Sequence, residues 1–588
     1  MIELELKTAT DETAERSRLT VAHALLALVA LLAAALRLTE LGALPLSAAE
    51  VEQALAVWRL SQPESTSVGL GGVSPAYFTF TTPLTQFAGD GDAMMRLVPA
   101  LAGLALVLLP WLWRKRLGAV GALTASLLLA VSPPFALVAR TAGGEAIALF
   151  ALLLLAIAAD RFMESERDGW LYIAFGALGL GLTSAPLFYG GLVVLGLAWG
   201  TLRLFGPALP PRMGANGHQS RATLRRAALF GLALFVAVAT LFLLRPAGLG
   251  AAAAQPMRWL GQFASPGGLS ERLAPVVALG RYDPLAVTLG AVAILWATWR
   301  SRPFDLFLAF WFAAATLLVL LQPGIMSGAL LVALPAYLLI ARLLQEAFRP
   351  PSRLASWGVA LAVVGAGAVI LANGARFLRV NTGPIPDYTY LLLALIVLSS
   401  AILLIYFIRM WDPVAALQGS LLGLLLLFLV YSWGTAWWLT HEAANDPREL
   451  WVTTGTDDDM RLLAEMLEEI SLQLTGAPHG VEVLVAVDNP ILRWYLRDFE
   501  NLLIGEMVPP RAQQRVIITS LDEAGLPGAN IDAESAYFGA DLGLLQHEAA
   551  PPVGPTMGEV LRWWLFRESP YPPQQERVVL WVRGDALR

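Results

Sequence analysis

The sequence predicts an α-helical protein that crosses a membrane about 13 times and ends in a small α/β domain. Hydrophobic residues make up 57% of the 588 positions and charged residues only 15%, with a mean hydropathy of +0.61. A soluble domain usually carries about 25% charge. Apolar segments of roughly 16–22 residues recur along the chain, close to the ~20 residues that a helix needs to cross a bilayer. After about residue 440 these segments stop, and short apolar runs alternate with helical patterns.

The predicted organisation has three parts. Residues 1–18 are polar and are expected to form a cytoplasmic tail, residues 19–440 a transmembrane domain, and residues 441–588 an extracytoplasmic domain. The first span is expected to be retained, because no A-x-A-type cleavage site follows it. The predicted spans lie near residues 20–38, 94–113, 119–138, 144–159, 170–184, 187–203, 226–245, 284–299, 304–321, 327–345, 357–375, 389–408 and 414–439. Between the fifth and sixth, Thr183–Pro186 is either a tight turn joining two spans or a break in one long tilted span.

Basic residues set the predicted orientation. Loops on the cytoplasmic side of a membrane protein are enriched in lysine and arginine. If the N-terminus is cytoplasmic, nearly every junction on that side is basic. These junctions contain Arg114, Lys115, Arg116, Arg161, Arg167, Arg203, Arg212, Arg221, Arg225, Arg226, Arg300, Arg302, Arg342, Arg349, Arg353 and Arg409. The sequence therefore predicts a multi-pass plasma-membrane protein whose long loops near 39–93 and 246–283 lie outside with the C-terminal domain.

Several classes of function lack support in the composition. There are no cysteines, so thiolate metal sites and disulfides are excluded, and a net charge of −6 gives no argument for nucleic-acid binding. The five histidines are scattered, and no phosphate-binding, zinc-protease or hydrolase motif occurs. No cofactor is predicted, and a requirement for a divalent metal stays open.

The stretch after the first span contains the first candidate site residue, Glu50. Residues 47–60 have apolar positions at helical spacing, which favours a helix at the membrane interface with Trp58 as its anchor. Ser47 and Glu50 have the Ser-x-x-Glu spacing of a capping box. Glu50 is therefore either a helix cap or a catalytic carboxylate at the mouth of a membrane cavity.

A second candidate pair follows the third span. Arg140 and Glu145 lie five residues apart with two glycines between them. A cation and carboxylates at one cavity could bind a phosphate and activate a hydroxyl, and charge at the edge of an apolar span is a functional hypothesis by default. The alternative is that these side chains extend to the interface for solvation. Arg96 is expected to be an interfacial anchor, and the loop 246–283 either a lid or a connector.

The last 150 residues predict strands alternating with helices, hence a small α/β domain. A capped amphipathic helix is expected after Thr456, and a short helix with Asn489 as cap and Pro490 at its first position. Strands are expected at 481–487, 515–519 and 577–582. The aromatic-rich helix at 557–567 has two interpretations: its tryptophans belong to the core of this domain, or they rest on lipid or on the helical bundle.

The order of these pieces resembles the GT-C class of polyprenol-dependent membrane glycosyltransferases, in particular the family 39 protein-mannosyltransferase group. It is most similar to the flippase-activity-associated branch of bacteria and archaea. The segments that carry the resemblance are LRLTELGALPLSAAE (36–50), SPAYFTFTTPLTQFAGDGDAMMRLVPALAGLALVLLP (74–110), LLLAVSPPFALVAR (127–140), WYLRDF (494–499) and RWWLFRE with VVLWVR (562–583).

This resemblance implies a GT-C-like fold and an extracytoplasmic site for a polyprenyl-phosphate-linked sugar. An acidic residue acts there as base and a basic residue receives the lipid phosphate. The sequence departs from the pattern His-His-Asp-Glu, for which it has Ser47-Ala48-Ala49-Glu50, so only Glu50 remains. The pattern Arg-x-x-Arg-Asn-Asp is reduced to Arg140 and Glu145.

The leading functional hypothesis is hexosyl transfer from a polyprenyl-phosphate donor to an extracytoplasmic glycan, lipid or protein of the cell envelope. Glu50 would be the catalytic carboxylate, Arg140 the phosphate ligand and Glu145 its support. On this hypothesis Glu50→Gln abolishes transfer and leaves expression intact. The alternative is a catalytically inactive relative that binds polyprenyl lipid or assists a flippase or envelope-assembly partner.

Overall fold

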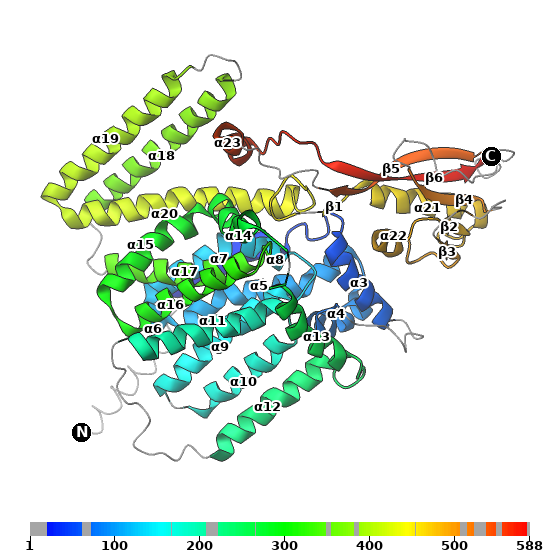
Figure 1. Ribbon diagram of the computed structural model, residues 1–588, viewed down its shortest axis with the longest axis horizontal. Helices are drawn as coiled ribbons and strands as arrows, with labels where there is room; N and C mark the ends of the chain where they lie inside the picture. Colours follow the sequence, from blue (N-terminus) through cyan, green and yellow to red (C-terminus); the bar gives the residue numbers. More distant parts are fainter. Residues whose placement is uncertain are drawn as a thin grey trace, which may run out of the picture.

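The computed structural model describes most of the chain, and Figure 1 shows its arrangement. The described residues are 20–61, 72–165, 167–206, 221–264, 266–348, 354–381, 387–452, 454–505, 508, 514–521, 537–547 and 556–584. The predicted tail at residues 1–18 and most of the glycine-rich part of the first outside loop lie outside these ranges.

The first three quarters of the chain form a bundle of apolar helices. In order they are α2 (Val21–Leu38), α3 (Ala48–Ser61), α4 (Pro75–Ala88), α5 (Asp92–Leu112), α6 (Arg114–Leu117), α7 (Ala119–Val131), α8 (Pro133–Ala139), α9 (Glu145–Ser165), α10 (Asp168–Leu182), α11 (Pro186–Phe205), α12 (Arg221–Ala239), α13 (Gly248–Gly261), α14 (Leu269–Tyr282), α15 (Pro284–Arg300), α16 (Pro303–Leu321), α17 (Gly328–Ala347), α18 (Leu354–Val380), α19 (Thr389–Trp411), α20 (Pro413–Trp437) and the π-helical turn η1 (Trp438–Glu442).

Helix lengths confirm a multi-pass membrane protein but not the count of 13 spans. Within the described residues, 10 helices are long and apolar enough to cross a membrane, or up to 12 if each of two bent pairs is one span. All the predicted segments are helical, but α10 has only 15 residues. A turn at Thr183 and Ser184 separates α10 from α11, so the break is a connection between two helices. Because α10 falls short of the ~20 residues of a full crossing, it is the element that leaves the count open.

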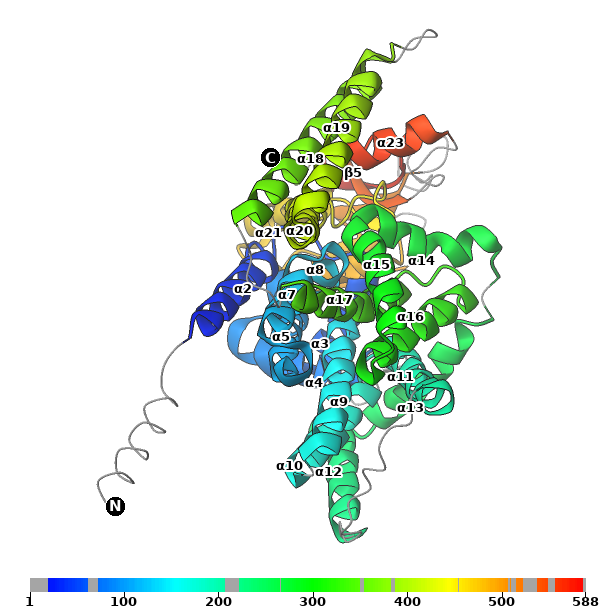
Figure 2. The same ribbon diagram turned by 90° about the vertical axis from the view of Figure 1, so that its left-hand side faces the viewer.

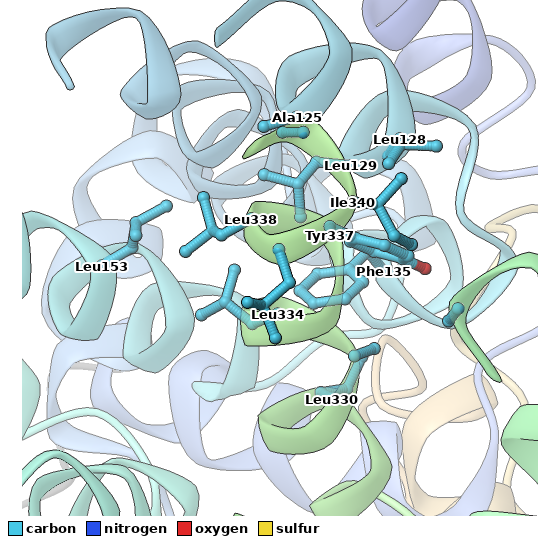
Figure 3. Packing of buried hydrophobic residues seen from close by; sticks show 14 of the residues in the cluster. Ala125, Leu128, Leu129, Phe135, Leu153, Leu330, Leu334, Tyr337, Leu338 and Ile340 are labelled. Carbon is cyan, nitrogen blue, oxygen red and sulfur yellow. The ribbon is translucent and has the colours of Figure 1, made fainter. Parts of the chain in front are cut away.

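The most buried helix of the bundle is α17. Its central residues pack on α7, α8 and α9, as Figure 3 shows for Leu334, Tyr337 and Leu338. By contrast, α18 and α19 lie at the periphery beside α20 (Figure 2), and only Ala394 of α19 is buried. An apolar surface as large as that of α19 is stable only in lipid or against another apolar surface, which agrees with its length of 23 residues.

The helix termini gather at two ends of the bundle. At one end Arg116 pairs with Asp160 at 3.0 Å and Arg342 with Asp305 at 2.7 Å, which joins the α6, α9, α16 and α17 termini. At the other end lie α3, α4, α13 and the C-terminal sheet (Figure 1). The predicted basic junctions that the structure describes therefore share the end away from the sheet.

Two prolines break the third span. The helices α7 and α8 meet at 64°, and Pro133 and Pro134 begin α8. A proline lacks the N–H that would bond the carbonyl four residues earlier. The carbonyls of Leu129 and Ala130 accept instead from Arg37 Nη2 at 2.8 Å and Nη1 at 2.9 Å. Arg37 is only 1% exposed, so it replaces in the core the donors that the prolines remove.

The C-terminal region forms a six-stranded mixed sheet with the order β1-β5-β6-β4-β2-β3. Strands β3, β2 and β4 are parallel, whereas β4, β6, β5 and β1 pair antiparallel. The elements are β1 (Thr454–Thr456), α21 (Asp459–Thr475), β2 (Val483–Val485), α22 (Pro490–Tyr495), β3 (Leu502–Ile504), β4 (Val516–Ser520), β5 (Tyr537–His547), α23 (Met557–Phe566) and β6 (Gln574–Arg583). The predicted strands at 481–487, 515–519 and 577–582 are confirmed, and so is the Asn489 cap, whose Oδ1 accepts from Ile491 N at 2.8 Å.

Helix α23 packs on the helical bundle and not in the core of the sheet domain. Trp563 is fully buried against Tyr282 and Leu439, and Trp564 donates to the Arg281 carbonyl at 3.0 Å. The buried carboxylate of Glu449 accepts from Tyr282 Oη at 2.6 Å beside this contact. Of the two interpretations of this aromatic helix, the structure therefore supports packing on the bundle.

Candidate functional site

A cavity of about 420 Å³ opens where the bundle meets the C-terminal region. It lies between the start of α3, the turn after α8, and the segment from η1 to β1. Its lining residues are Glu40, Leu44, Ser47, Ala48, Ala49, Glu50, Glu52, Arg96, Leu137, Arg140, Thr141, Thr440, Ala444, Trp451, Val452 and Thr454. Two of the predicted site residues, Glu50 and Arg140, are therefore brought together, and the third, Glu145, is not among the lining residues.

Glu50 is held by hydrogen bonds on both carboxylate oxygens. Oε1 accepts from Arg96 Nε at 2.8 Å and from Ala142 N at 2.9 Å. Oε2 accepts from Arg96 Nη2 at 2.8 Å, from Ser47 N at 2.9 Å and from Ser47 Oγ at 3.1 Å. Burial raises the pKa of this carboxyl, but the Arg96 charge and the hydrogen bonds outweigh it and hold the pKa below its ordinary value. Glu50 is thus an ionised cap of α3, with little capacity left to accept another proton donor.

Arg96 is the site residue that the sequence analysis missed. It is 5% exposed and lies one turn into α5, so it is a buried ligand of Glu50 and not an interfacial anchor. Its remaining N–H groups donate to the carbonyls of Leu41, Leu44 and Pro45 at 3.2, 2.8 and 2.9 Å. All five N–H groups of the guanidinium therefore have acceptors. The rule that singled out Arg140, charge at the edge of a span, would have identified Arg96 too.

Arg140 binds the backbone at the end of α2. Nη1 donates to the carbonyls of Leu36 at 3.3 Å and Thr39 at 2.6 Å, and Nη2 to that of Glu40 at 3.0 Å. No carboxylate within the described residues forms an ion pair with it. Burial lowers its pKa to about 10, which leaves the guanidinium charged at neutral pH. With Nε and one Nη2 hydrogen not used in these bonds, Arg140 is a buried cation with donors to spare.

Glu52 and Glu40 are the exposed carboxylates of this cavity. No hydrogen bond or ion pair holds either carboxylate within the part of the chain that the structure describes. Ala48 and Ala49 line the wall beside Glu52 and supply no polar group. The charged groups of the cavity are therefore one ion pair, whose members are fully hydrogen-bonded, one cation with donors to spare and two acids without a bonded partner in the described chain.

Glu145 begins α9 on another side of the turn. A Cβ on Gly143 would approach the Glu145 Oε2 to 2.6 Å, and one on Gly144 would approach Ser74 Oγ to 2.4 Å. The two glycines therefore allow the chain to turn tightly against Ser74 and its own first helical carboxylate. Glu145 therefore lies close to Gly143, and Gly144 lies close to Ser74. Of the three residues predicted to converge, Glu50 and Arg140 line the cavity and Glu145 does not.

Side-chain donors bind the backbone carbonyls of the loop from α2 to α3 and hold this loop in place. Beyond the three bonded to Arg96, the carbonyls of Gly42 and Ala43 accept from Arg461 at 2.8 and 2.6 Å. The Pro45 carbonyl also accepts from Asn445, and that of Leu46 from Thr456 at 2.6 Å. Every carbonyl from residue 41 to residue 46 thus has a side-chain donor. An irregular loop fixed in this way gives the cavity a rigid wall.

Asp92 connects the C-terminal region to the same wall. Its carboxylate accepts from Arg461 at 2.6 Å, Trp494 Nε1 at 3.0 Å and Tyr495 Oη at 3.1 Å. Asp90 pairs in turn with Arg497 at 3.2 Å. The WYLRDF segment, noted in the sequence for its resemblance, therefore docks on the two acids at the start of α5.

A metal site does not emerge from the described residues. No group of three or more histidine or acidic side chains there has the arrangement of a metal site. His441 stacks on Trp437 at 3.9 Å and its Nε2 lies 3.0 Å from Thr39 Oγ1, so the ring is engaged in packing.

Comparison with known proteins gives a family match over part of the chain. Residues 73–199 match the family model of dolichyl-phosphate-mannose-protein mannosyltransferases. No curated protein matches the sequence significantly.

Comparison with solved structures finds distant matches over most of the chain. ArnT from Cupriavidus metallidurans bound to undecaprenyl phosphate is 16% identical, with a TM-score of 0.47 over 94% of this chain and 97% of ArnT. The apo form of ArnT gives the same identity and score over 82% and 86%. The Archaeoglobus fulgidus oligosaccharyltransferase in its apo form is 12% identical, with a TM-score of 0.46 over 82% of this chain and 64% of the archaeal one. The resemblance to membrane glycosyltransferases that the sequence carries is thus confirmed by the family model over residues 73–199.

Proposed function

We propose that the protein transfers a sugar from a polyprenyl-phosphate donor to an acceptor on the outer face of the plasma membrane, at the cavity between α3 and the turn after α8. The observation that carries this proposal is Arg140, a buried cation that lines the cavity without a carboxylate partner in the described chain. The family match over residues 73–199 includes Arg140 and supports the same reaction class.

A phosphate leaving group needs a fixed cation, because negative charge develops on it as the bond to the sugar breaks. The carbonyls of Leu36, Thr39 and Glu40 hold the guanidinium in place and leave other N–H groups for phosphate oxygens. Glu50 and Arg96 neutralise each other in this arrangement and shape the wall. Glu145, outside the cavity, receives no contact with the donor.

The proposed function also requires an orientation of the protein in the membrane. The end with the cavity and the sheet is assigned to the outer face, because the basic junctions lie at the opposite end. The acceptor would then be an extracytoplasmic glycan, lipid or protein.

One observation favours a second candidate, a lipid-binding scaffold that assists a flippase or an envelope-assembly partner. Glu50 has five hydrogen bonds and Ala49 offers no acid beside it, so the carboxylate expected to act as base is unavailable. A protein with a phosphate site and no base would bind the lipid and not turn it over.

The test measures binding and transfer in the same samples of purified full-length protein, with radiolabelled polyprenyl-phosphate hexoses and envelope acceptors. Arg140→Gln is expected to weaken donor binding about 10- to 100-fold, the range for a hydrogen bond to a charged group. Arg116→Gln, which removes a guanidinium at the opposite end, is the matched control and is expected to bind as the wild type does. Binding without transfer by the wild type favours the scaffold, and absence of binding to any polyprenyl phosphate overturns both candidates.

A further inference from the structure

We infer that Glu52, and not Glu50, takes the proton from the acceptor hydroxyl; this inference rests on the proposed transfer reaction. Three carboxylates line the cavity, those of Glu40, Glu50 and Glu52. A general base must present an oxygen lone pair to the hydroxyl within about 2.6–3.2 Å. The choice among the three is therefore a question of which oxygens are free and where they can reach.

Glu50 fails this requirement by its contacts. Its oxygens already accept five hydrogen bonds, two of them from Arg96. To act as base it would have to exchange one of these bonds for the acceptor, in a place that is 3% exposed. Protonation would also leave the Arg96 guanidinium buried beside a neutral acid, which is unfavourable.

Glu52 lies two positions after Glu50 in α3 and has carboxylate oxygens free to accept the hydroxyl proton. Its side chain is exposed at the cavity, and no hydrogen bond or ion pair engages it in the described chain. Side chains on a helix lean toward its N-terminus and cover the preceding turn. Residues three and four positions earlier are Ala49 and Ala48, both in the cavity wall. Their small side chains leave room for the Glu52 carboxylate over the start of α3, in a cavity that Arg140 also lines.

Glu40 is the competing acid, and its position suits the reaction less well. It follows α2 in a left-handed conformation, with φ of 48°, and its own carbonyl accepts from Arg140. A carboxylate at the phosphate-binding cation opposes a second negative charge there. We therefore assign no proton transfer to Glu40, and its variant tests the competing assignment.

Glu52 and Arg140 together account for the proton and the negative charge that move in the transfer step. The acceptor oxygen forms a bond to the anomeric carbon while its proton passes to a Glu52 carboxylate oxygen. The bond between the anomeric carbon and the phosphate oxygen breaks, and its electron pair stays with the phosphate. Arg140 stabilises the charge on the departing polyprenyl phosphate. Glu52 then loses its proton to water in the open cavity.

The experiment uses the full-length protein and a donor that the wild type uses. It compares Glu52→Gln, Glu52→Asp, Glu52→Ala, Glu40→Gln and the control Glu469→Gln. Glu52→Gln is expected to lower the transfer rate about 10²- to 10⁴-fold, the usual contribution of a general base. Donor binding and melting temperature are expected to stay at the wild-type values in Glu52→Gln. Glu52→Asp is expected to retain part of the rate, and Glu40→Gln more of it than Glu52→Gln does. Glu469→Gln, at an exposed position of α21 that does not line the cavity, is the matched control and is expected to transfer as the wild type does. Added formate is expected to restore part of the rate in Glu52→Ala, because a small carboxylate can enter the space vacated by the side chain.

Transfer by Glu52→Gln within threefold of the wild type would overturn the assignment and leave the proposed function standing. Loss of transfer in Glu40→Gln, with Glu52→Gln unaffected, would move the role to Glu40. If the wild type binds donor but transfers to no acceptor, the proposed function itself fails and the base assignment with it.

Discussion

The two ends of the helical bundle hold their arginines in place in different ways. At the end away from the sheet, Arg116 and Arg342 pair with acids, as does the less buried Arg302 with Glu346. At the end with the cavity, Arg37 and Arg140 bond only to backbone carbonyls in the described chain, while Arg96 has both carbonyls and Glu50. A carbonyl orients a guanidinium but removes none of its net charge.

The ion-paired arginines serve the packing of helices, whereas the carbonyl-bound arginines keep a charge that a ligand could use. The ion pairs of Arg116 and Arg342 hold helices together, and each pair is neutral. Carbonyl-bound Arg140 at the other end is fixed in position and keeps its positive charge in the cavity wall, which is suited to a phosphate. The same residue type thus serves packing at one end and is proposed to serve recognition at the other.

The largest effect is expected from Glu50→Gln, which leaves Arg96 buried without its carboxylate. Removal of one partner of a buried ion pair typically costs about 3–5 kcal/mol. The free energy of unfolding, measured by denaturant titration in detergent, is expected to fall by about that amount. The structure thus replaces the sequence-based expectation that this variant leaves expression intact, because Glu50 ties together α3, α5 and the turn after α8.

The matched control for that variant is Asp305→Asn at the other end. Asp305 is fully buried and pairs with Arg342 at 2.7 Å. A similar loss of stability is expected, but donor affinity per folded molecule should stay unchanged. Weaker donor binding in Asp305→Asn would break the distinction between the two ends.

A smaller effect is expected for Arg37, and it depends on the two prolines. Arg37→Met leaves the Leu129 and Ala130 carbonyls without donors, at a cost of about 1–3 kcal/mol. In a Pro133→Ala/Pro134→Ala background the helix can supply its own N–H groups, so the same substitution should cost less. A double-mutant cycle on unfolding free energies measures this coupling, and additive costs would show that Arg37 does not replace those donors.

The last prediction concerns which end faces the cytoplasm. The chain contains no cysteine, so single cysteines can be introduced directly. In intact cells, Glu469→Cys on exposed α21 should react with a membrane-impermeant maleimide, whereas Lys115→Cys at the opposite end should react only after lysis. The reverse pattern would refute the proposed orientation and place the cavity inside the cell.

Local patterns in the sequence were enough to predict the helices but not the environment of the charges. The apolar segments, the Ser47–Glu50 cap and the Asn489 cap depend on residues within a few positions, and all form. Arg96 reaches back 46 positions to Glu50 and also bonds to carbonyls, which every residue possesses and no sequence pattern marks. For the same reason the engagement of Glu50 could not be foreseen. Strands β1, β3 and β5 were missed too. Strands β1 and β3 are three-residue edge strands, and β5 contains polar residues and glycines, so none has a clear apolar run.

The contact between Arg37 and the α7–α8 break also has a consequence for biosynthesis. The partner carbonyls lie 92 and 93 positions after the arginine. At about 5–20 residues per second, the ribosome needs roughly 5–20 s to deliver them. During that interval the last turn of α2 contains a cation without these two carbonyl partners. Truncated chains that stop before Leu129 should therefore be poorly retained in the bilayer and be early substrates for membrane quality control.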